Sequence, residues 1–334
     1  MIEWLKLPDE QKRQVLREAS GRTRLATNAI EKDWWVTLAL RASFMTPWKD
    51  NLVFKGGTSL SKAWSLIERF SEDIDLVMDR EALGFTGEMT NTQIKKLRKK
   101  TAEFMATEFL AALETTLAGI GVDPRLMKLD IQPGGVADRD PQILQLHYQS
   151  VLEPDAYLAE KVIIEIGARS LMEPASNKTI HSILGTAIPG QAYSDDSYTV
   201  LTVDPKRTFL EKVFLLHEEF SKPAEKIRHN RMSRHHYDLE KLMDTEFGKA
   251  AMTDTALYQL IVHHREKFTP LRGIDYHRHS PATINFLPPA AVLPQWEIDY
   301  DLMQGSMIYG PSPSFKVLLE RMEELTSRFR ALAA

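Results

Sequence analysis

The stretch FKGGTSLSKAWSLIERFSEDIDLVM, residues 54–78, constrains the fold of this chain more than any other part of the sequence. Its pattern predicts a strand, a tight turn on two adjacent glycines, a short helix, a second turn and a second strand. Asp73 and Asp75 stand on that second strand, one on each side of Ile74. The stretch therefore predicts a sheet that brings a glycine turn and two carboxylates close together.

The glycine turn predicts a site for an anion. Gly56 and Gly57 follow an apolar strand, where glycine lets successive backbone N–H groups converge on one point. Thr58 or Ser59 then begins a helix, and the N-terminus of a helix carries partial positive charge. This order predicts a phosphate cradle, although the spacing of a Walker A loop is absent. An ordinary strand-to-helix turn is the alternative.

The acidic pair predicts a metal site. Residues i and i+2 of a strand point to the same side, so Asp73 and Asp75 share a face about 6–7 Å apart along the backbone, while Ile74 points into the core. Two acids this close repel each other, and a pair of divalent metal ions is their natural counter-charge. Solvated acids on an exposed strand edge are the alternative.

Glu165 is the candidate for a third metal-binding carboxylate. It stands in the middle of the apolar run Val162–Ile166, where a charged side chain is costly without a partner. A third carboxylate commonly helps to hold the metal that activates an attacking hydroxyl. An ion pair with Lys161 or Arg169 is the alternative.

Strand patterns are concentrated before residue 204 and helical patterns after it. We expect an α+β part at 1–204 with helices at its N-terminus, and a helical part at 205–334. The segment 270–300, rich in proline and aromatic residues, is expected to wrap over the helices. The predicted helices cover 8–20, 25–45, 91–119, 205–220, 232–244, 253–266 and 313–332; the predicted strands besides those of the 54–78 stretch cover 143–151, 161–168 and 198–203; a loop-rich zone covers 171–196.

Composition excludes several classes of site. The chain of 334 residues has no cysteine, which excludes disulfides and thiolate chemistry, and its formal net charge of −4 argues against wholesale coating of nucleic acid. No apolar run approaches the roughly 20 residues of a membrane helix, and the charged N-terminus lacks the apolar core of a signal peptide. We expect a cytoplasmic protein with no membrane partner.

The motifs together resemble a known superfamily. A glycine turn, a short helix and Asp-hydrophobic-Asp on the next strand resemble the polymerase-β-like nucleotidyltransferase signature. GGTSLSK at 56–62 with RFSEDIDL at 69–76 resembles the AbiEii/AbiGii-type nucleotidyltransferase toxins more closely, and IEKDWW at 30–35 and DYDLMQGSMIYG with PSF at 299–315 fit the same family. The resemblance implies a mixed sheet with flanking helices and a helical C-terminal part.

The resemblance also implies roles for individual residues. Lys212 would contact the triphosphate and Asp238 would complete the catalytic set; a surface lysine, and a surface acid paired with Lys241 or Arg234, are the alternatives. Many relatives carry Arg-Asp where this chain has Arg234-His235. Two Mg²⁺, or Mn²⁺, would bind Asp73, Asp75 and Glu165, and the nucleotide would bind Gly56, Gly57, Thr58, Ser59, Lys62 and Lys212.

Residues 222–236, KPAEKIRHNRMSRHH, form a basic stretch that predicts an RNA contact. A surface charge cluster is the alternative. His263-His264 and His277-Arg278-His279 lack the spacing of zinc ligands, so we expect them to be structural or to face RNA. The residues expected to contact RNA are Lys226, Arg228, Arg231 and Arg234.

The implied function is that of a toxin in a phage-defence toxin–antitoxin pair. It would transfer nucleotides from an NTP to RNA, in some relatives to the 3′ end of tRNA, release pyrophosphate, and have a separate antitoxin protein as partner. Transfer of AMP or phosphate to a Ser, Thr or Tyr hydroxyl of a protein would use the same site and stays open. A non-catalytic nucleotide-binding protein is the third reading, against which the intact set of motifs argues.

Overall fold

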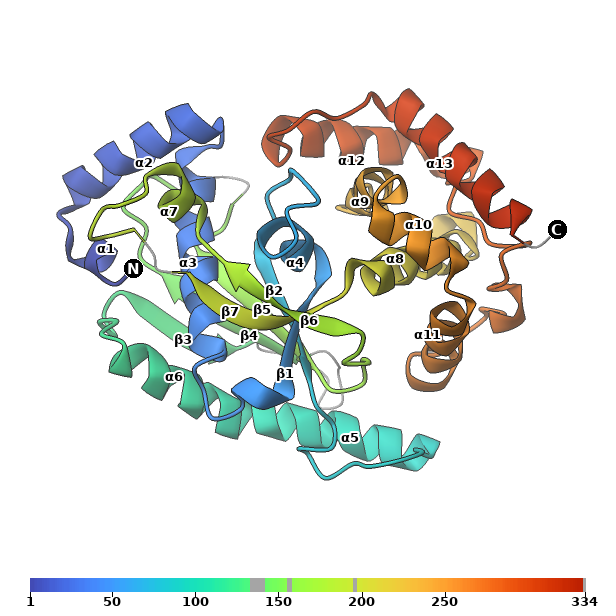
Figure 1. Cartoon of the computed structure of the whole chain (residues 1–334), viewed down its shortest axis with the longest axis horizontal. Helices are drawn as coiled ribbons and strands as arrows, with labels where there is room; N and C mark the ends of the chain where they lie inside the picture. Colours follow the sequence, from blue (N-terminus) through green and yellow to red (C-terminus); the bar gives the residue numbers. More distant parts are fainter. Residues whose placement is uncertain (133–141, 155–157, 195–196, 333–334) are drawn as a thin grey trace. The chain divides into compact units, whose positions relative to one another are not determined.

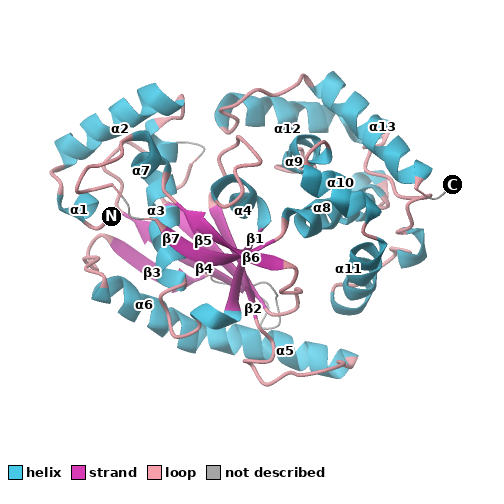
Figure 2. Ribbon diagram, viewed as in Figure 1, coloured by secondary structure: helices cyan, strands magenta, loops and turns pink. Residues whose placement is uncertain are grey.

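A computed structural model describes residues 1–132, 142–154, 158–194 and 197–332 of the chain. Its contacts divide the chain into two compact units, one made of Met1–Trp64 with Phe70–Val203 and the other of Ser65–Arg69 with Asp204–Ala334. The first unit contains a mixed sheet with flanking helices and the second is helical (Figures 1 and 2). The predicted α+β class with a helical C-terminal part is therefore confirmed.

Among the described residues, seven strands of the first unit form one mixed sheet. The strands are β1 Leu52–Lys55, β2 Asp73–Met78, β3 Met127–Ile131, β4 Gln142–Tyr148, β5 Lys161–Gly167, β6 Ala175–Ile180 and β7 Tyr198–Val203. Their order is β3-β4-β5-β2-β1-β7-β6. β2 pairs in parallel with β5, and β1 in parallel with β7, while the other neighbours are antiparallel.

The middle of the sheet is apolar, as central strands require. On β2, Ile74, Leu76 and Met78 are buried on one face. On the opposite face Val77 joins Val53 in a small buried cluster, next to the half-buried Asp75. One face of β2 therefore packs entirely in the core. The other face has a buried end at Val77 and a less buried end that carries the two aspartates.

The helices of the first unit contribute further buried apolar side chains to its core. α3 contacts both β2 and β5, and it buries Trp34 and Trp35 (Figure 1). The predicted helix 91–119 is continuous but contains a π-helical turn at Met105–Phe109. The helices are α1 Glu3–Lys6, α2 Asp9–Thr23, α3 Thr27–Ser43, α4 Gly56–Lys62, α5 Asn91–Phe104, α6 Leu110–Gly119 and α7 Ile183–Ala187.

The helices of the second unit begin directly after β7. Asp204 caps the first of them, accepting a hydrogen bond from the Lys206 amide at 2.8 Å, and Pro205 occupies the first helical turn, as the sequence predicts. None of the described helices in either unit is long and apolar enough to cross a bilayer. The helices are α8 Pro205–Phe220, α9 Arg234–Met243, α10 Glu246–Thr253, α11 Thr255–Phe268, α12 Leu293–Ser306 and α13 Phe315–Ala331.

Several elements differ from the sequence prediction, and β3 and α10 are among those that it did not include. The expected loop-rich zone 171–196, whose last two residues lie outside the described part, contains β6 and α7. The segment 270–300, expected to wrap over the helices, ends within α12, which has proline in its first turn. β6 was missed because it is an edge strand with mostly half-exposed polar residues, so it shows no apolar alternation.

Candidate active site

The glycine turn lies directly against one of the two aspartates. Gly56 has φ of +81°, and it begins α4 straight after the extended Lys55. A Cβ built on Gly56 would lie 2.0 Å from Asp75 Oδ2. Both the left-handed backbone and this close approach require glycine at position 56. The turn and Asp75 of the acidic strand therefore lie side by side, as the 54–78 stretch predicts.

The two hydroxyls of the turn are used within the protein. Thr58 Oγ1 lies 2.8 Å from Ser71 Oγ and donates to the Asp73 carbonyl oxygen at 2.5 Å, while Ser59 Oγ donates to the Gly56 carbonyl oxygen at 2.9 Å. Both side chains are buried. These bonds fix α4 to the start of β2. The predicted contact of Thr58 and Ser59 with nucleotide stays a prediction.

Three carboxylates share one face of the sheet. Asp75 pairs with Glu165 on the parallel neighbour β5, and Asp73 stands two residues before Asp75 on β2. Paired residues of adjacent strands point to the same face, about 4.8 Å apart. Lys55 on β1 also pairs with Asp75, so one row of the sheet holds Lys55, Asp75 and Glu165. The expected common face of the three acids is thus built by the register of β2 and β5.

The donor chemistry of this face fits a hard divalent cation. Asp73, Asp75 and Glu165 offer only oxygen ligands, which Mg²⁺ and Mn²⁺ prefer. The side chains are not drawn together into a ligand shell, because among the described residues no three His, Asp or Glu side chains are grouped to hold a metal. Binding would require these side chains to turn toward a common ion, and the metal site stays a prediction.

A second group of charges lies in the helical unit around Asp238 of α9. This carboxylate is fully buried and accepts hydrogen bonds from Arg69 Nε at 2.7 Å and Arg69 Nη2 at 2.8 Å, while Lys212 Nζ lies 2.8 Å from Asp238 Oδ2. Lys212 Nζ also lies 3.5 Å from His235 Nδ1. The alternatives of a surface lysine and a surface acid are therefore wrong.

Burial and the nearest opposite charge shift the pKa values of Asp238 and Lys212 in opposite directions. Burial alone would raise the pKa of Asp238, but Arg69 and Lys212 hold it at about 2. Burial lowers the pKa of Lys212 from its ordinary value, and Asp238 partly offsets the shift. Burial, together with the charge of Lys212, lowers the pKa of His235 well below its ordinary value. At neutral pH the group therefore contains the ionised carboxylate of Asp238, the guanidinium of Arg69 and a neutral imidazole.

Arg69 is a member of this group that sequence reasoning missed. It lies in the short segment Ser65–Arg69, which belongs to the helical unit. The Tyr309 and Gly310 amides donate to the Glu68 carbonyl oxygen at 3.0 and 3.3 Å, and Arg69 forms a β-bridge with Ile308. A Cβ on Gly310 would lie 2.3 Å from Glu68 Oε2. The MIYG motif therefore holds the segment that presents Arg69.

The IEKDWW motif has a bracing role that the sequence also left unassigned. Lys32 of α3 forms a nearly buried 2.5 Å ion pair with Glu72, the residue before Asp73. Asp33 likewise forms a 2.6 Å ion pair with Lys62 at the end of α4. Consecutive charges on α3 thereby hold both sides of the turn–helix–strand unit. The ammonium of Lys62 already has an anionic partner, and its predicted nucleotide contact stays a prediction.

The basic stretch 222–236 contains paired charges. Arg228 Nη2 lies 2.7 Å and Lys222 Nζ 2.8 Å from the buried carboxylate of Glu219. The side chain of Asp299, from the DYDLM motif, accepts hydrogen bonds from the Arg231 amide at 2.5 Å and the Ser233 amide at 2.8 Å, which fixes the entry to α9. The predicted RNA contacts of Lys226, Arg228, Arg231 and Arg234 stay a prediction.

Comparison with known proteins gives a family match over most of the chain. The family model described as the nucleotidyl transferase AbiEii toxin of the type IV toxin–antitoxin system matches residues 39–321. JHP933 from Helicobacter pylori is 14% identical over 93% of this chain and 100% of that one, with a TM-score of 0.35. A candidate nucleotidyltransferase from H. pylori is 15% identical over 88% and 98%, with a TM-score of 0.34. No curated protein matches the sequence.

Proposed function

The chain belongs to the family of AbiEii nucleotidyltransferase toxins of type IV toxin–antitoxin systems, and from this premise we propose that it transfers nucleotides from an NTP to a hydroxyl of RNA, with release of pyrophosphate. The 3′ end of tRNA is the proposed acceptor, and the cytoplasm the proposed compartment. Family membership makes the chain a nucleotidyltransferase and implies an antitoxin as its genetic partner.

The contact between the glycine turn and Asp75 supports this chemistry most directly. A phosphate at the turn would lie beside a carboxylate, since a Cβ on Gly56 would meet Asp75 Oδ2 at 2.0 Å, and Glu165 pairs with Asp75 on the next strand. Two anions repel, so this arrangement suits a bound cation between phosphate and carboxylate. Asp73, Asp75 and Glu165 would hold Mg²⁺ or Mn²⁺, which neutralises the phosphates and lowers the pKa of the acceptor hydroxyl when bound.

The other residues of the proposal bind and orient. The backbone N–H groups that follow Gly56 would donate hydrogen bonds to a phosphate oxygen, and the bonds of Thr58 to Ser71 and Asp73 keep that backbone in place. Lys212 would place a positive charge on the triphosphate. Asp238 favours the charged ammonium of Lys212 against the effect of burial. Catalysis of this kind rests on position and charge, without a covalent intermediate on the protein.

The test is a transfer assay with radiolabelled nucleotides. Each of the four NTPs, labelled at the α or the γ phosphate, is incubated with the protein, Mg²⁺ and either total RNA or total protein. We expect α-label in RNA, and we expect Asp75→Asn to abolish it while the melting temperature is retained. Label only in protein, or full activity of Asp75→Asn, would contradict the proposal.

A further inference from the structure

Lys55 places a positive charge in the row of residues that holds two of the three acids, and the proposed function gives it no role. It is the last residue of β1 and pairs with Asp75 of β2, which in turn pairs with Glu165 of β5. Directly opposite residues of an antiparallel pair point to the same face, with Cβ atoms about 4.5–5.5 Å apart. The half-buried side chain of Lys55 therefore lies on the same face of the sheet as Asp75.

The ammonium group of Lys55 contacts a neutral group instead of an acid. Its Nζ donates a hydrogen bond to Ser170 Oγ at 3.2 Å. Within the residues that the structure describes, Lys55 forms no ion pair with a carboxylate. The serine hydroxyl accepts one of the three N–H donors of an ammonium and carries no charge. The positive charge of Lys55 is thus left without a direct counter-ion.

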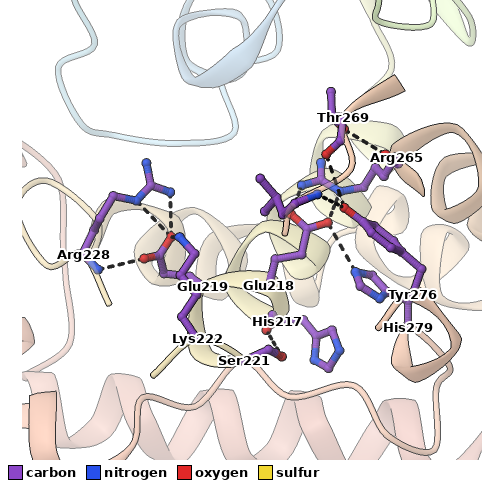
Figure 3. A network of polar contacts seen from close by, with 11 residues as sticks. His217, Glu218, Glu219, Ser221, Lys222, Arg228, Arg265, Thr269, Tyr276 and His279 are labelled. Carbon is purple, nitrogen blue, oxygen red and sulfur yellow. Dashed lines mark hydrogen bonds and ion pairs between the residues drawn. The ribbon is translucent and has the colours of Figure 1, made fainter. Parts of the chain in front are cut away.

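Other cations that contact buried groups differ from Lys55 in this respect. Lys32 and Lys62, in the same unit, lie 2.5 and 2.6 Å from carboxylate oxygens. In the helical unit, the lysine and arginine side chains drawn in Figure 3 contact the carboxylates of Glu218 and Glu219. The charges of these side chains are therefore offset within the protein, whereas Lys55 can offer its charge to a ligand.

The position of Lys55 indicates which anion it would meet. Gly56 follows directly, and the backbone N–H groups after Gly56 are those proposed to hold a phosphate oxygen. Lysine carries its donors on a flexible stem, so the ammonium can turn from Ser170 to a phosphate at this turn.

The neighbouring acids narrow the class of anion further. Asp75 and Glu165 repel an anion that arrives without a metal ion. Mg²⁺ sites commonly combine one or two protein carboxylates with the phosphates of a substrate. The ligand that fits the turn, the acids and Lys55 together is therefore a polyphosphate that binds with Mg²⁺.

We propose that Lys55 binds the triphosphate of the NTP and exchanges its hydrogen bond to Ser170 for one to a phosphate oxygen. This inference rests on the proposed function, in which a triphosphate with its metal lies between the glycine turn and the acids. Lys55 would then be a second lysine for the triphosphate besides Lys212, and it belongs to the same unit as the turn and the acids.

The test measures binding without turnover. The full-length protein is titrated calorimetrically, in the presence of Mg²⁺ and without RNA, with inorganic tripolyphosphate and with each of the four NTPs. Lys55→Met removes the charge, and we expect it to weaken the binding of tripolyphosphate about 10- to 100-fold, the effect of one lost charge-assisted hydrogen bond. Lys55→Arg keeps the charge and should retain most of the affinity.

Two further variants separate binding from a structural role. Ser170→Ala removes the partner that Lys55 has within the protein but leaves the ammonium, so the affinity for tripolyphosphate should be unchanged. Lys49→Met is the matched control, because Lys49 is an exposed lysine just before β1 and should give wild-type affinity. If Lys55→Met does not fold, Lys55→Gln, which keeps a donor for Ser170 but no charge, carries the same expectation.

Four outcomes would overturn the proposal. The first is that the wild type binds neither tripolyphosphate nor any NTP, and the second is undiminished affinity in Lys55→Met. The third is an equal loss of affinity in Lys55→Met and Ser170→Ala, which would make the contact between these two side chains structural. The fourth is a loss confined to the binding of total RNA on filters, which would assign Lys55 to the phosphates of the acceptor.

The failure of this inference is distinct from that of the proposed function. A wild type that binds tripolyphosphate through Lys55 but places no label in RNA would contradict the transfer reaction and keep the inference. Label in RNA with the same KM for the NTP in wild type and Lys55→Met would contradict the inference and keep the transfer reaction.

Discussion

At the scale of single residues, the site depends on positions where a side chain has no room. Gly56 combines a left-handed backbone with an approach to Asp75 that leaves no space for a methyl group. Gly84 has nearly the same φ, +85° against +81°, but nothing lies within 4 Å of its Cβ position. The two glycines therefore separate the effect of backbone strain from that of crowding against a proposed metal ligand.

We predict that Gly56→Ala lowers the transfer rate by about 100-fold or more, because displacement of a reacting group by about 1 Å has this effect. Gly84→Ala carries a similar backbone penalty of roughly 1–2 kcal/mol and should leave the rate unchanged. Steady-state transfer and melting curves of both variants measure the two effects. Equal rates in the two variants would mean that the contact with Asp75 does not matter.

Asp238 carries the second prediction at this scale. Asp238→Asn leaves Arg69 and Lys212 buried without an anion, which should cost about 3–5 kcal/mol of unfolding free energy. Asp244→Asn removes an exposed partner of Arg321 and Arg328 and should cost at most about 1 kcal/mol. Urea unfolding at pH 7 measures both.

The difference in unfolding free energy between wild type and Asp238→Asn should depend on pH in a definite direction. Asp238 has a pKa of about 2 in the folded protein, below the ordinary 3.8. Its contribution is therefore complete above about pH 4 and is lost as the pH falls toward 2. The stability gap between wild type and Asp238→Asn should narrow in that range. A gap that widens on acidification would contradict the assignment of an ionised Asp238.

At the scale of elements, the sequence predicted those helices and strands that nearby residues mark, by a capping residue or by alternating polarity. The N-cap and proline of α8 and the alternating burial of β2 are of this kind. β3 and β6 escaped because they are the two edge strands of the sheet, whose half-exposed residues show little alternation. Arg69 escaped for a different reason. The role of Arg69 depends on its pairing with Asp238, which lies 169 positions away in the sequence. A local sequence pattern cannot predict a pair so far apart.

The segment Ser65–Arg69 gives the prediction at this scale. Gly310→Ala would place its Cβ 2.3 Å from Glu68 Oε2 and 2.5 Å from Glu68 Cβ, so the segment must shift and loosen the Arg69–Asp238 pair. We expect a loss of about 1–3 kcal/mol in unfolding free energy. Gly305→Ala, on α12 with open space around it, should be neutral or stabilising by up to about 1 kcal/mol. Chemical denaturation compares them, and equal stability of the two variants would show that the segment is not clamped.

At the scale of the whole molecule, each of the two units is built from two separate segments of the chain. The helical unit takes Arg69 from a segment that lies between α4 and β2 in the sequence. A fragment of residues 204–334 would therefore contain Asp238 and Lys212 but lack their guanidinium partner. Its helices carry their own caps and apolar faces, yet its buried carboxylate would lose a bidentate hydrogen bond.

We predict that the 204–334 fragment unfolds at lower urea concentration than the same unit within the full chain, by the equivalent of about 3–5 kcal/mol. Arg69→Met in the full chain should destabilise the unit by a comparable amount, because both changes remove the same partner of Asp238. Hydrogen exchange of α8 and α9 amides measures the unit separately in all three proteins. Undiminished protection of those amides in the fragment would show that the helical unit is stable without Arg69.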